Sequence, residues 1–441
     1  MARTAGGDLK ASRRDFLKST GAAAAGLALG ERAFSAAKTE ILALNGGPPA
    51  VSAPPIDADR WPLYGADEEN AVLALLRTPN YEPNAQLESE WREYLGVPHA
   101  KTHCNGTSAL VSMFFALDLP PGSEILVPSY TFFATIAPMR FFGLVPVFVD
   151  INPRTLNLDL EDAKKRLTKN TRAILPVHWI GLPCDMDAIS EWAKEKGLIV
   201  LEDAAHAHGA KLQGRLMGTW SRVAIFSFQM TKPLPGIEGG MGVYQDKADY
   251  HRAAALGDYQ LEGVPEDSDY MKYKGSGLGL KLRMHPIAAE LVRVQLRGLD
   301  KRNAAGAAQV RKLNDRLVQL SGLYEQTSGR KDMERIYYSW NMLFIDEKEA
   351  GMTRDQAVTA LQAEGVKTSS FSYRLQHKLP LYAEAKWWHH APTIPDLPGS
   401  EQANATAIPL PYFTSEQPEL VEQYVRAFEK VWAHRKEIGK A

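Results

Sequence analysis

Short apolar runs that recur between residues 125 and 244 constrain the fold more than any other feature of the sequence. They cover residues 125–127, 145–149, 173–177, 198–201, 223–228 and 241–244, and most are rich in Val and Ile. Stretches with apolar residues at intervals of three and four separate several runs, as at 159–167 and 186–196, and this spacing indicates helices. Buried strands that alternate with helices predict an α/β fold with a mostly parallel sheet covered on both faces.

The pattern changes near residue 298. Beyond it come long polar helices, a strand candidate at 337–345 and a terminal helix at about 418–434. We therefore predict a large domain over residues 38–297 and a smaller C-terminal α+β domain over residues 298–441. The Pro-rich stretch at 392–411 is expected to be a surface connection.

The first 37 residues have the layout of an export signal. Basic residues come first, an uncharged run at 21–30 follows, and small residues occupy 33–37. The stretch 12–18, Ser-Arg-Arg-Asp-Phe-Leu-Lys, resembles a twin-arginine signal, and the apolar run is too short to span a bilayer. We predict that residues 1–37 are a signal peptide and that the protein is exported to the periplasm or otherwise outside the cytoplasmic membrane. The alternative is a disordered basic leader with a chance arginine pair.

Charge and cysteine content exclude several functions. The chain has 51 Lys and Arg against 52 Asp and Glu, so it has no basic surplus to bind nucleic acid or an anionic membrane. Its two cysteines, Cys104 and Cys184, are too few for a disulfide scaffold and lack the close spacing of a zinc motif. We therefore expect small-molecule partners, no nucleic acid and no metal.

Three polar features stand at expected strand and helix ends, where α/β folds bind their ligands. The sequence Asn-Gly-Thr-Ser at 105–108 precedes an apolar helix, so backbone amides and the Thr107 hydroxyl could hold a phosphate. Asp203 ends the apolar strand at 198–203, and Lys232 follows the strand at 223–228 and begins a glycine-rich turn. Each feature has an ordinary explanation by itself: a helix cap, a loop acid and a solvated lysine.

Taken together, the three features match the needs of pyridoxal phosphate. This cofactor has a phosphate that suits a helix N-terminus and a pyridine nitrogen that a carboxylate keeps protonated. It also has an aldehyde that a lysine binds as a Schiff base. The combination therefore predicts a pyridoxal 5'-phosphate site that contains Asp203 and Lys232.

Several longer segments extend this agreement to a known family. They are residues 42–47, 104–110, 128–135, 146–150, 181–186, 202–209 and 227–240. Through them nearly the whole mature chain resembles the DegT/DnrJ/StrS sugar aminotransferases. The resemblance implies the aspartate aminotransferase (type I) fold of pyridoxal phosphate-dependent enzymes.

The resemblance also assigns roles to individual residues. It implies that Lys232 forms the Schiff base and that Asp203 pairs with the pyridine nitrogen. Gly106, Thr107 and Ser227 match the family's phosphate contacts.

Aromatic and histidine residues complete the implied site. Phe132 matches the residue that stacks on the cofactor ring, although Phe133 and Tyr130 compete for this role and core packing is the alternative. His206 stands where many members carry Gln and is expected against the ring. His208 is expected to be packed or to cap a helix.

Lys281 marks a departure from the family pattern. In many members an Asn from the neighbouring subunit contacts the cofactor phosphate within a Gly-x-Asn-x-Arg-Met segment. Residues 279–284 read Gly-Leu-Lys-Leu-Arg-Met, which puts Lys281 at the Asn position. An ammonium can bind phosphate as a point charge, and a solvated lysine is the alternative. The resemblance further implies a homodimer with shared active sites.

The implied activity is a transamination from an amino acid donor, glutamate or glutamine, to a keto-sugar or keto-cyclitol, with Lys232 as general base and acid. Tyr373 and His377 are candidates to touch the substrate, although packing explains them equally well. Two alternatives remain: an exported protein of this fold with a binding or regulatory role, and another reaction such as sugar dehydration. Lys232 opposes the latter, because relatives that dehydrate deoxysugars carry histidine at its position.

Overall fold

The computed structural model describes residues 40–52 and 60–440, and the predicted signal at 1–37 lies outside them. Its centre is a seven-stranded sheet made of β1 (His99–His103), β2 (Glu124–Pro128), β3 (Val145–Val149), β4 (Thr171–Ile174), β5 (Ile199–Asp203), β8 (Val223–Ser227) and β9 (Gly240–Tyr244). The strands follow the order β1-β9-β8-β5-β4-β2-β3. All pairs are parallel except those that β9 forms with β8 and β1. The predicted α/β fold with a mostly parallel sheet is confirmed.

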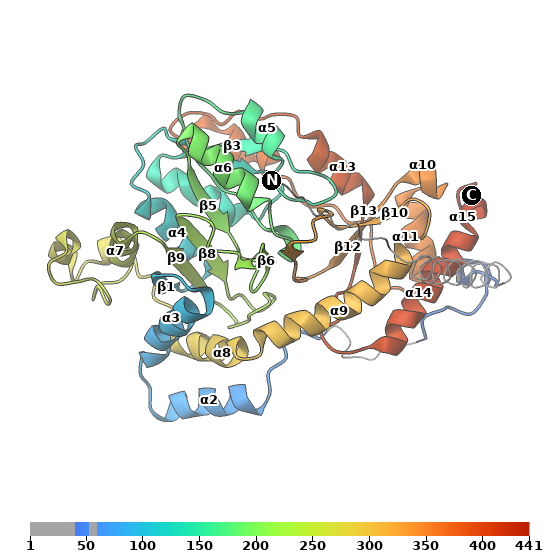
Figure 1. The fold of residues 1–441 in the computed structure, drawn as a ribbon, viewed down its shortest axis with the longest axis horizontal. Coiled ribbons are helices and arrows are strands. Elements are labelled where there is room, and N and C mark those ends of the chain that lie inside the picture. Colours follow the sequence, from blue (N-terminus) through green and yellow to red (C-terminus); the bar gives the residue numbers. More distant parts are fainter. Residues whose placement is uncertain (1–39, 53–59, 441) are drawn as a thin grey trace, which may run out of the picture.

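Both faces of this sheet are buried, as its apolar runs predict. Along β2, Leu126 packs into one core, whereas Ile125 and Val127 pack into the other. The first core includes residues of α3 (Glu82–Leu95), α5 (Leu160–Lys165), α6 (Met186–Lys196) and α8 (Pro286–Leu296), and α2 (Ala66–Arg77) packs on α8. The second includes residues of α4 (Gly106–Ala116) and α7 (Lys247–Ala255). Figure 1 shows these helices around the sheet.

Within the large sheet, the apolar pattern misses β1. Its sequence, His-Ala-Lys-Thr-His, is polar, yet all of its residues after His99 are buried. Lys101 Nζ lies 3.1 Å from Asp258 Oδ2, and Thr102 donates both its N–H and its hydroxyl to Glu88. Partners distant in sequence therefore satisfy these polar groups, and no local pattern reveals them.

A second, antiparallel sheet lies in the C-terminal part. It consists of β10 (Leu323–Glu325), β12 (Asn341–Ile345) and β13 (Ala407–Leu410), in the order β10-β12-β13. The long helix α9 (Leu299–Leu317) runs toward this sheet from α8, and α14 (Pro418–Ala433) packs against α9 (Figure 1). The shorter helices of this part are α10 (Glu347–Ala350), α11 (Arg354–Ala363), α12 (Pro380–Ala383), α13 (Pro398–Thr406) and α15 (Arg435–Ile438).

The prediction of a surface connection at residues 392–411 is wrong. This stretch contains α13 and β13, and every residue of β13 is buried. Proline is tolerated in β13 because the strand lies at the edge of its sheet, where one side needs no N–H donor. The Pro content therefore misled the prediction.

A small third sheet connects the two predicted domains. In it β6 (Lys211–Leu212) pairs with β7 (Arg215–Leu216) and with β11 (Met333–Glu334). Since β11 lies beyond residue 298, the C-terminal part adds a strand to a hairpin formed by residues of the predicted large domain. The division at residue 298 stays a prediction.

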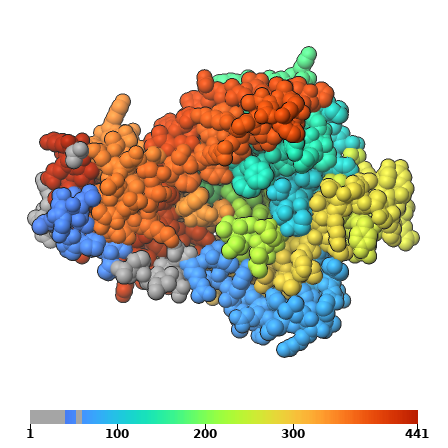
Figure 2. All heavy atoms as spheres, turned by 180° about the vertical axis from the view of Figure 1, so that it is seen from behind, coloured from blue at the N-terminus to red at the C-terminus, as the bar shows by residue number. Residues whose placement is uncertain are grey.

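The segment between α7 and α8 projects from one end of the molecule, in yellow in Figure 1 and, from behind, in Figure 2. Its regular structure is limited to the 3₁₀ helices η5 (Asp269–Tyr273) and η6 (Gly277–Gly279). Lys281 lies on this segment and is exposed.

Candidate active site

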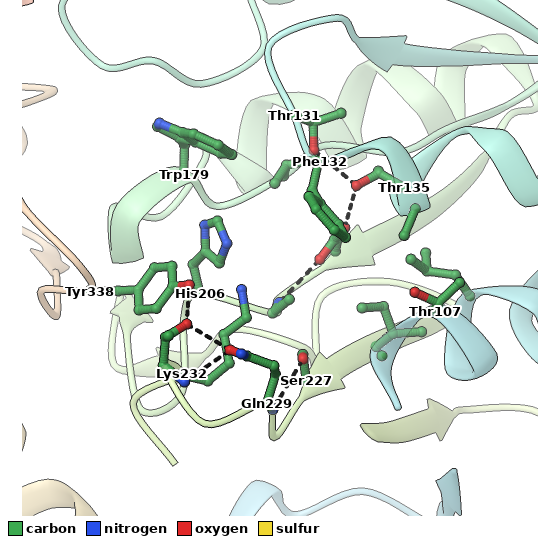
Figure 3. Close-up of a pocket in the computed structure, with 18 of the residues that line it drawn as sticks. Thr107, Thr131, Phe132, Thr135, Trp179, His206, Ser227, Gln229, Lys232 and Tyr338 are labelled. Carbon is green, nitrogen blue, oxygen red and sulfur yellow. Dashed lines mark hydrogen bonds between the residues drawn. The ribbon is translucent and has the colours of Figure 1, made fainter. Parts of the chain in front are cut away.

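A cavity of about 520 Å³ lies at the carboxyl ends of β2, β5 and β8 (Figure 3). The N-terminus of α4 and three aromatic residues of the C-terminal part, Tyr338, Trp340 and Tyr373, complete its wall. Every residue predicted for the cofactor site except Lys281 lines it, namely Gly106, Thr107, Phe132, Asp203, His206, Ser227 and Lys232. The cavity thus brings together residues from distant parts of the sequence.

The N-terminus of α4 forms one end of the cavity. Asn105 caps it by accepting a hydrogen bond from a backbone N–H of the first turn at 2.8 Å. A Cβ on Gly106 would lie 2.8 Å from the Cβ of Ser227, and a Cβ on Gly240 would lie 2.5 Å from the Asn105 backbone. Glycine at both positions therefore lets the Ser227 hydroxyl, Thr107 and the helix amides approach one point. Such a set of donors at a helix N-terminus suits a phosphate.

Asp203 is buried at the C-terminal end of β5. Thr135 donates its hydroxyl to Asp203 Oδ2 at 2.8 Å, and the Ala205 N–H donates to Oδ1 at 3.1 Å (Figure 3). Burial raises the pKa of Asp203, and the two hydrogen bonds and the charge of Lys232 offset only part of that effect. A cationic ligand nitrogen would stabilise the ionised carboxylate further.

The loop that carries Lys232 is fixed by backbone hydrogen bonds. The Met230 N–H donates to the Ile237 carbonyl at 2.9 Å, and the Trp61 indole N–H donates to the Lys232 carbonyl at 3.0 Å. Lys232 Nζ lies 4.4 Å from the centroid of the Tyr338 ring. The lysine is therefore held at the cavity with its amine against an aromatic face.

His206 lies between Trp179 and Tyr338, with ring centroids 5.0 and 4.4 Å away. Its Nδ1 accepts a hydrogen bond from the Ile180 N–H at 3.4 Å. Burial, together with the nearby charge of Lys232, holds the pKa of His206 well below its usual range. The imidazole is therefore neutral and can offer an Nε2–H to a ligand.

The three aromatic residues considered for stacking on the cofactor ring differ in their exposure to the cavity. Phe132 and Phe133 both line the cavity and are half exposed, with ring centroids 4.5 Å apart. Tyr130 is fully buried against Trp179 and Tyr373. Burial therefore separates Tyr130 from the other two, and the stacking role of Phe132 stays a prediction.

Two of the histidines considered lie outside the cavity. His208 packs against Trp91 and Phe226, and burial lowers its pKa to about 3, which fits a packed histidine. His377 is buried with its Nδ1 2.6 Å from the Ser129 hydroxyl. Tyr373, by contrast, does line the cavity.

The sequence analysis missed Thr135 and Tyr338, each of which directly contacts a predicted residue. Thr135 lies in the segment 128–135 but reaches Asp203 only because the chain turns back as the 3₁₀ helix η2 (Phe133–Thr135). Tyr338 was assigned to the predicted strand 337–345, which begins only at Asn341. The turn that precedes β12 aims Tyr338 into the cavity instead.

The fold and the site define a class of protein, the type I aminotransferases. An X-ray structure of an aminotransferase from Psychrobacter cryohalolentis superposes with a TM-score of 0.76 at 26% identity, covering 85% of this chain and 98% of that one. S. venezuelae DesV, solved in complex with a ketimine intermediate, gives a TM-score of 0.72 at 29% identity over 83% of this chain and 94% of its own.

Sequence comparison then identifies the family. Residues 64–429 match the DegT/DnrJ/EryC1/StrS aminotransferase family, and the chain belongs to it. It is 32% identical over 344 residues to a putative L-glutamine:3-amino-2,3-dideoxy-scyllo-inosose aminotransferase of Streptoalloteichus tenebrarius. That match covers 76% of this chain and 81% of the relative. The protein is an aminotransferase.

The N-terminal prediction is supported in the same way. Residues 10–30 match the signal sequence of the twin-arginine translocation pathway. Within residues 40–52 and 60–440, no helix has both the length and the apolar character that a membrane span requires. The chain therefore carries an export signal.

The residues of the cavity fit pyridoxal phosphate. The glycines at 106 and 240 let Ser227 and the N-terminus of α4 pack closely, so that their donors lie together and suit its phosphate. The buried Asp203 suits a protonated ring nitrogen, and Lys232 is an amine on the same cavity. This donor set corresponds to the three functional groups of the cofactor.

Proposed function

We propose that this protein transfers an amino group from glutamine or glutamate to the ketone of a cyclitol or sugar, with pyridoxal phosphate as cofactor. One observation carries the proposal: Lys232, Asp203 and the α4 phosphate cradle line a single cavity. The scyllo-inosose named for the relative from Streptoalloteichus tenebrarius supports a keto-cyclitol as acceptor. Lys232 opposes a dehydratase, because relatives that dehydrate deoxysugars carry histidine at its position.

The protein residues divide the work between binding and proton transfer. The α4 amides, Thr107 and Ser227 bind the phosphate, and Phe132 and His206 flank the ring. Asp203 holds the proton on the ring nitrogen. The bound cofactor supplies an aldehyde carbon that takes up the amino group and a ring that accepts the electron pair released at the substrate carbon. Lys232 Nζ removes the proton from that carbon and later returns one.

We also infer a homodimer in which Lys281 reaches the neighbouring subunit's phosphate. Lys281 lies away from the cavity of its own chain. Next to it on the projecting segment, Leu280 is 46% exposed and lines an apolar groove with Phe115, Phe141 and Tyr273, among others. A second copy of the chain would cover this groove and bring Lys281 to the other cavity. The export signal further supports a site of action outside the cytoplasmic membrane.

The function is tested with purified protein, pyridoxal phosphate, glutamine or glutamate, and scyllo-inosose as acceptor. The wild type should form the amino-cyclitol, detected by mass spectrometry. Lys232→Ala should abolish it and should also abolish borohydride-dependent attachment of the cofactor to the chain. Lys194→Ala, a control on the exposed face of α6, should do neither. Covalent attachment without any transamination would favour a binding or regulatory role.

A further inference from the structure

The cavity contains one acidic side chain to which the proposed function gives no role. Glu238 lines the cavity and is exposed, whereas Asp203, the other acid of the lining, is buried and accepts two hydrogen bonds. Among the described residues, none donates a hydrogen bond to the Glu238 carboxylate. This carboxylate is therefore available to a ligand of the cavity.

The backbone next to Glu238 is strained. Ile237 has a φ of +68°, a conformation that L residues rarely adopt and that residues branched at Cβ adopt least of all. The Glu238 N–H donates to the Gly236 carbonyl at 2.8 Å and closes a γ-turn around Ile237. A γ-turn with a positive φ is the rare, strained form. Strain of this kind persists where the surrounding structure fixes it, often at functional sites.

The surrounding chain holds this turn in place. The Gly236 N–H donates to the Phe228 carbonyl and the Phe228 N–H donates to the Gly239 carbonyl, both at 2.8 Å, so the loop closes just after β8. A Cβ on Gly236 would lie 2.6 Å from Val292 Cγ2 on α8, which shows how closely the turn packs on that helix. Glu238 therefore stands between neighbours whose positions are fixed.

The charges of the cavity wall limit the ligands that suit Glu238. Of the described residues that line the cavity, Lys232 is the only lysine or arginine, and the proposed function already uses it for the cofactor. A phosphate or carboxylate beside Glu238 would meet a like charge that no further cation of the lining offsets. A group that donates two hydrogen bonds, such as an amide NH₂ or a pair of hydroxyls, suits the carboxylate instead.

The C-terminal part supplies an aromatic wall to the same cavity. Trp340 and Tyr373 line it and are half-buried, and the Tyr373 ring packs on Trp179 with centroids 4.7 Å apart. In scyllo-inosose the hydroxyl groups point outward along the ring edge, so both faces of the ring present C–H bonds. Such a ring can pack a face on aromatic side chains and still direct its hydroxyls toward a carboxylate.

We propose that Glu238 determines specificity in both half-reactions by accepting hydrogen bonds from the uncharged end of each substrate. In the first, it binds the side-chain amide of glutamine and disfavours glutamate, whose second carboxylate would face a like charge. In the second, it binds hydroxyl groups of a polyol acceptor and disfavours a phosphorylated or nucleotide-linked acceptor. One residue serves both because the two substrates occupy the same cavity in turn. This inference rests on the proposed function.

Glutamine and glutamate give the sharpest test, because they have nearly the same shape and differ in the charge at the end of the side chain. Conversion of the holoenzyme by each donor, without acceptor, is followed by absorbance in single turnovers. The wild type should react more efficiently with glutamine. Glu238→Gln should lower the efficiency with glutamine about tenfold, the change expected for one hydrogen bond to a charged group, and narrow the preference. Glu191→Gln, which changes an exposed acid on α6, should match the wild type.

The acceptor is tested by binding and by turnover. Scyllo-inositol has no ketone and cannot react, so calorimetric titration into the holoenzyme measures binding alone. Its affinity should fall about tenfold in Glu238→Gln and stay unchanged in Glu191→Gln. In turnover with glutamine, the wild type should have a higher kcat/KM for scyllo-inosose than for TDP-4-keto-6-deoxyglucose. Glu238→Gln should reduce this ratio, mainly by raising KM for scyllo-inosose.

The outcomes separate this inference from the proposed function. A wild type that uses both donors equally or prefers the nucleotide-linked acceptor would overturn the inference. An unchanged donor ratio or scyllo-inositol affinity in Glu238→Gln would also overturn it. So would a shift of Glu238→Gln toward monomer with discrimination intact, because the carboxylate would then belong to a contact with a second copy of the chain. Failure of both donors to convert the wild-type holoenzyme would count against the proposed function, and the scyllo-inositol titration would still test Glu238.

Discussion

Replacing Thr135 with Val tests how much one hydrogen bond offsets the burial of the Asp203 carboxylate. Thr135 and valine have nearly the same shape, so the change removes the donor of the 2.8 Å bond to Asp203 Oδ2 and, with it, the 2.8 Å contact of the same hydroxyl with Thr131. A hydrogen bond to a charged, buried group stabilises it by about 1.5–3 kcal/mol. Without it the pKa of Asp203, which burial already raises, should rise further.

The stability effect has a defined pH dependence. A carboxyl whose folded pKa lies above its unfolded value destabilises the fold as pH rises from the unfolded toward the folded pKa. Thr135→Val widens this window. The variant should therefore lose about 1.5–3 kcal/mol of unfolding free energy at neutral pH. Most of the loss should vanish well below the unfolded Asp value of about 3.9, where the carboxyl is protonated in both states.

Urea unfolding of cofactor-free protein at several pH values measures this difference. Thr131→Val is the matched control, because Thr131 contacts the Thr135 hydroxyl at 2.8 Å and not Asp203. It should have a smaller and nearly pH-independent effect. A loss in Thr135→Val that is the same at acid and neutral pH would refute the electrostatic explanation. The acid limb of the pH–activity profile should also move to higher pH in Thr135→Val.

Three further changes test other parts of the proposal. Lys281→Ala should weaken retention of pyridoxal phosphate by about 1–3 kcal/mol, measured by equilibrium dialysis, if its ammonium binds the phosphate of the neighbouring subunit. Leu280→Glu should place a charge in the apolar groove and shift sedimentation toward monomer; a wild type that is already monomeric at micromolar concentration would contradict the shared site. Changing Arg13 and Arg14 to Lys together should leave folded, unprocessed protein inside the cell, and normal export would contradict the signal assignment.

The apolar runs predicted most of the large sheet because its strands are buried on both faces. β3 and α6 have the bounds read from the sequence, and the other runs begin or end within a few residues of their strands. The sequence pattern failed to predict β1 and β13, for opposite reasons. Polar β1 is buried through partners such as Asp258, and the prolines near β13 concealed an edge strand. In both cases tertiary contacts override the local pattern.

The sequence predicted those residues of the candidate site that lie at or just after the end of a strand. Asp203 ends one buried strand and Lys232 follows another, so both are expected at the same edge of the sheet whatever the conformation of the loops. Tyr338 could not be found in this way, because its place depends on the positive φ of Ser339 and on contacts of Arg335 with the chain after β4. A pattern of alternating residues carries no signal for such a turn.

The two adjacent acids at the end of β5 show why only one of them suits a ligand. Strand alternation sends Glu202 and Asp203 to opposite faces of the sheet. Glu202 accepts hydrogen bonds from His178, the Gly218 and Trp220 N–H groups and the Ser221 hydroxyl, and although burial opposes ionisation, these partners hold its pKa below the usual range. Asp203 has two donors, and its pKa remains raised. The fold thus satisfies Glu202 completely and leaves Asp203 with unused capacity on the cavity side, where a protonated ring nitrogen would be its third partner.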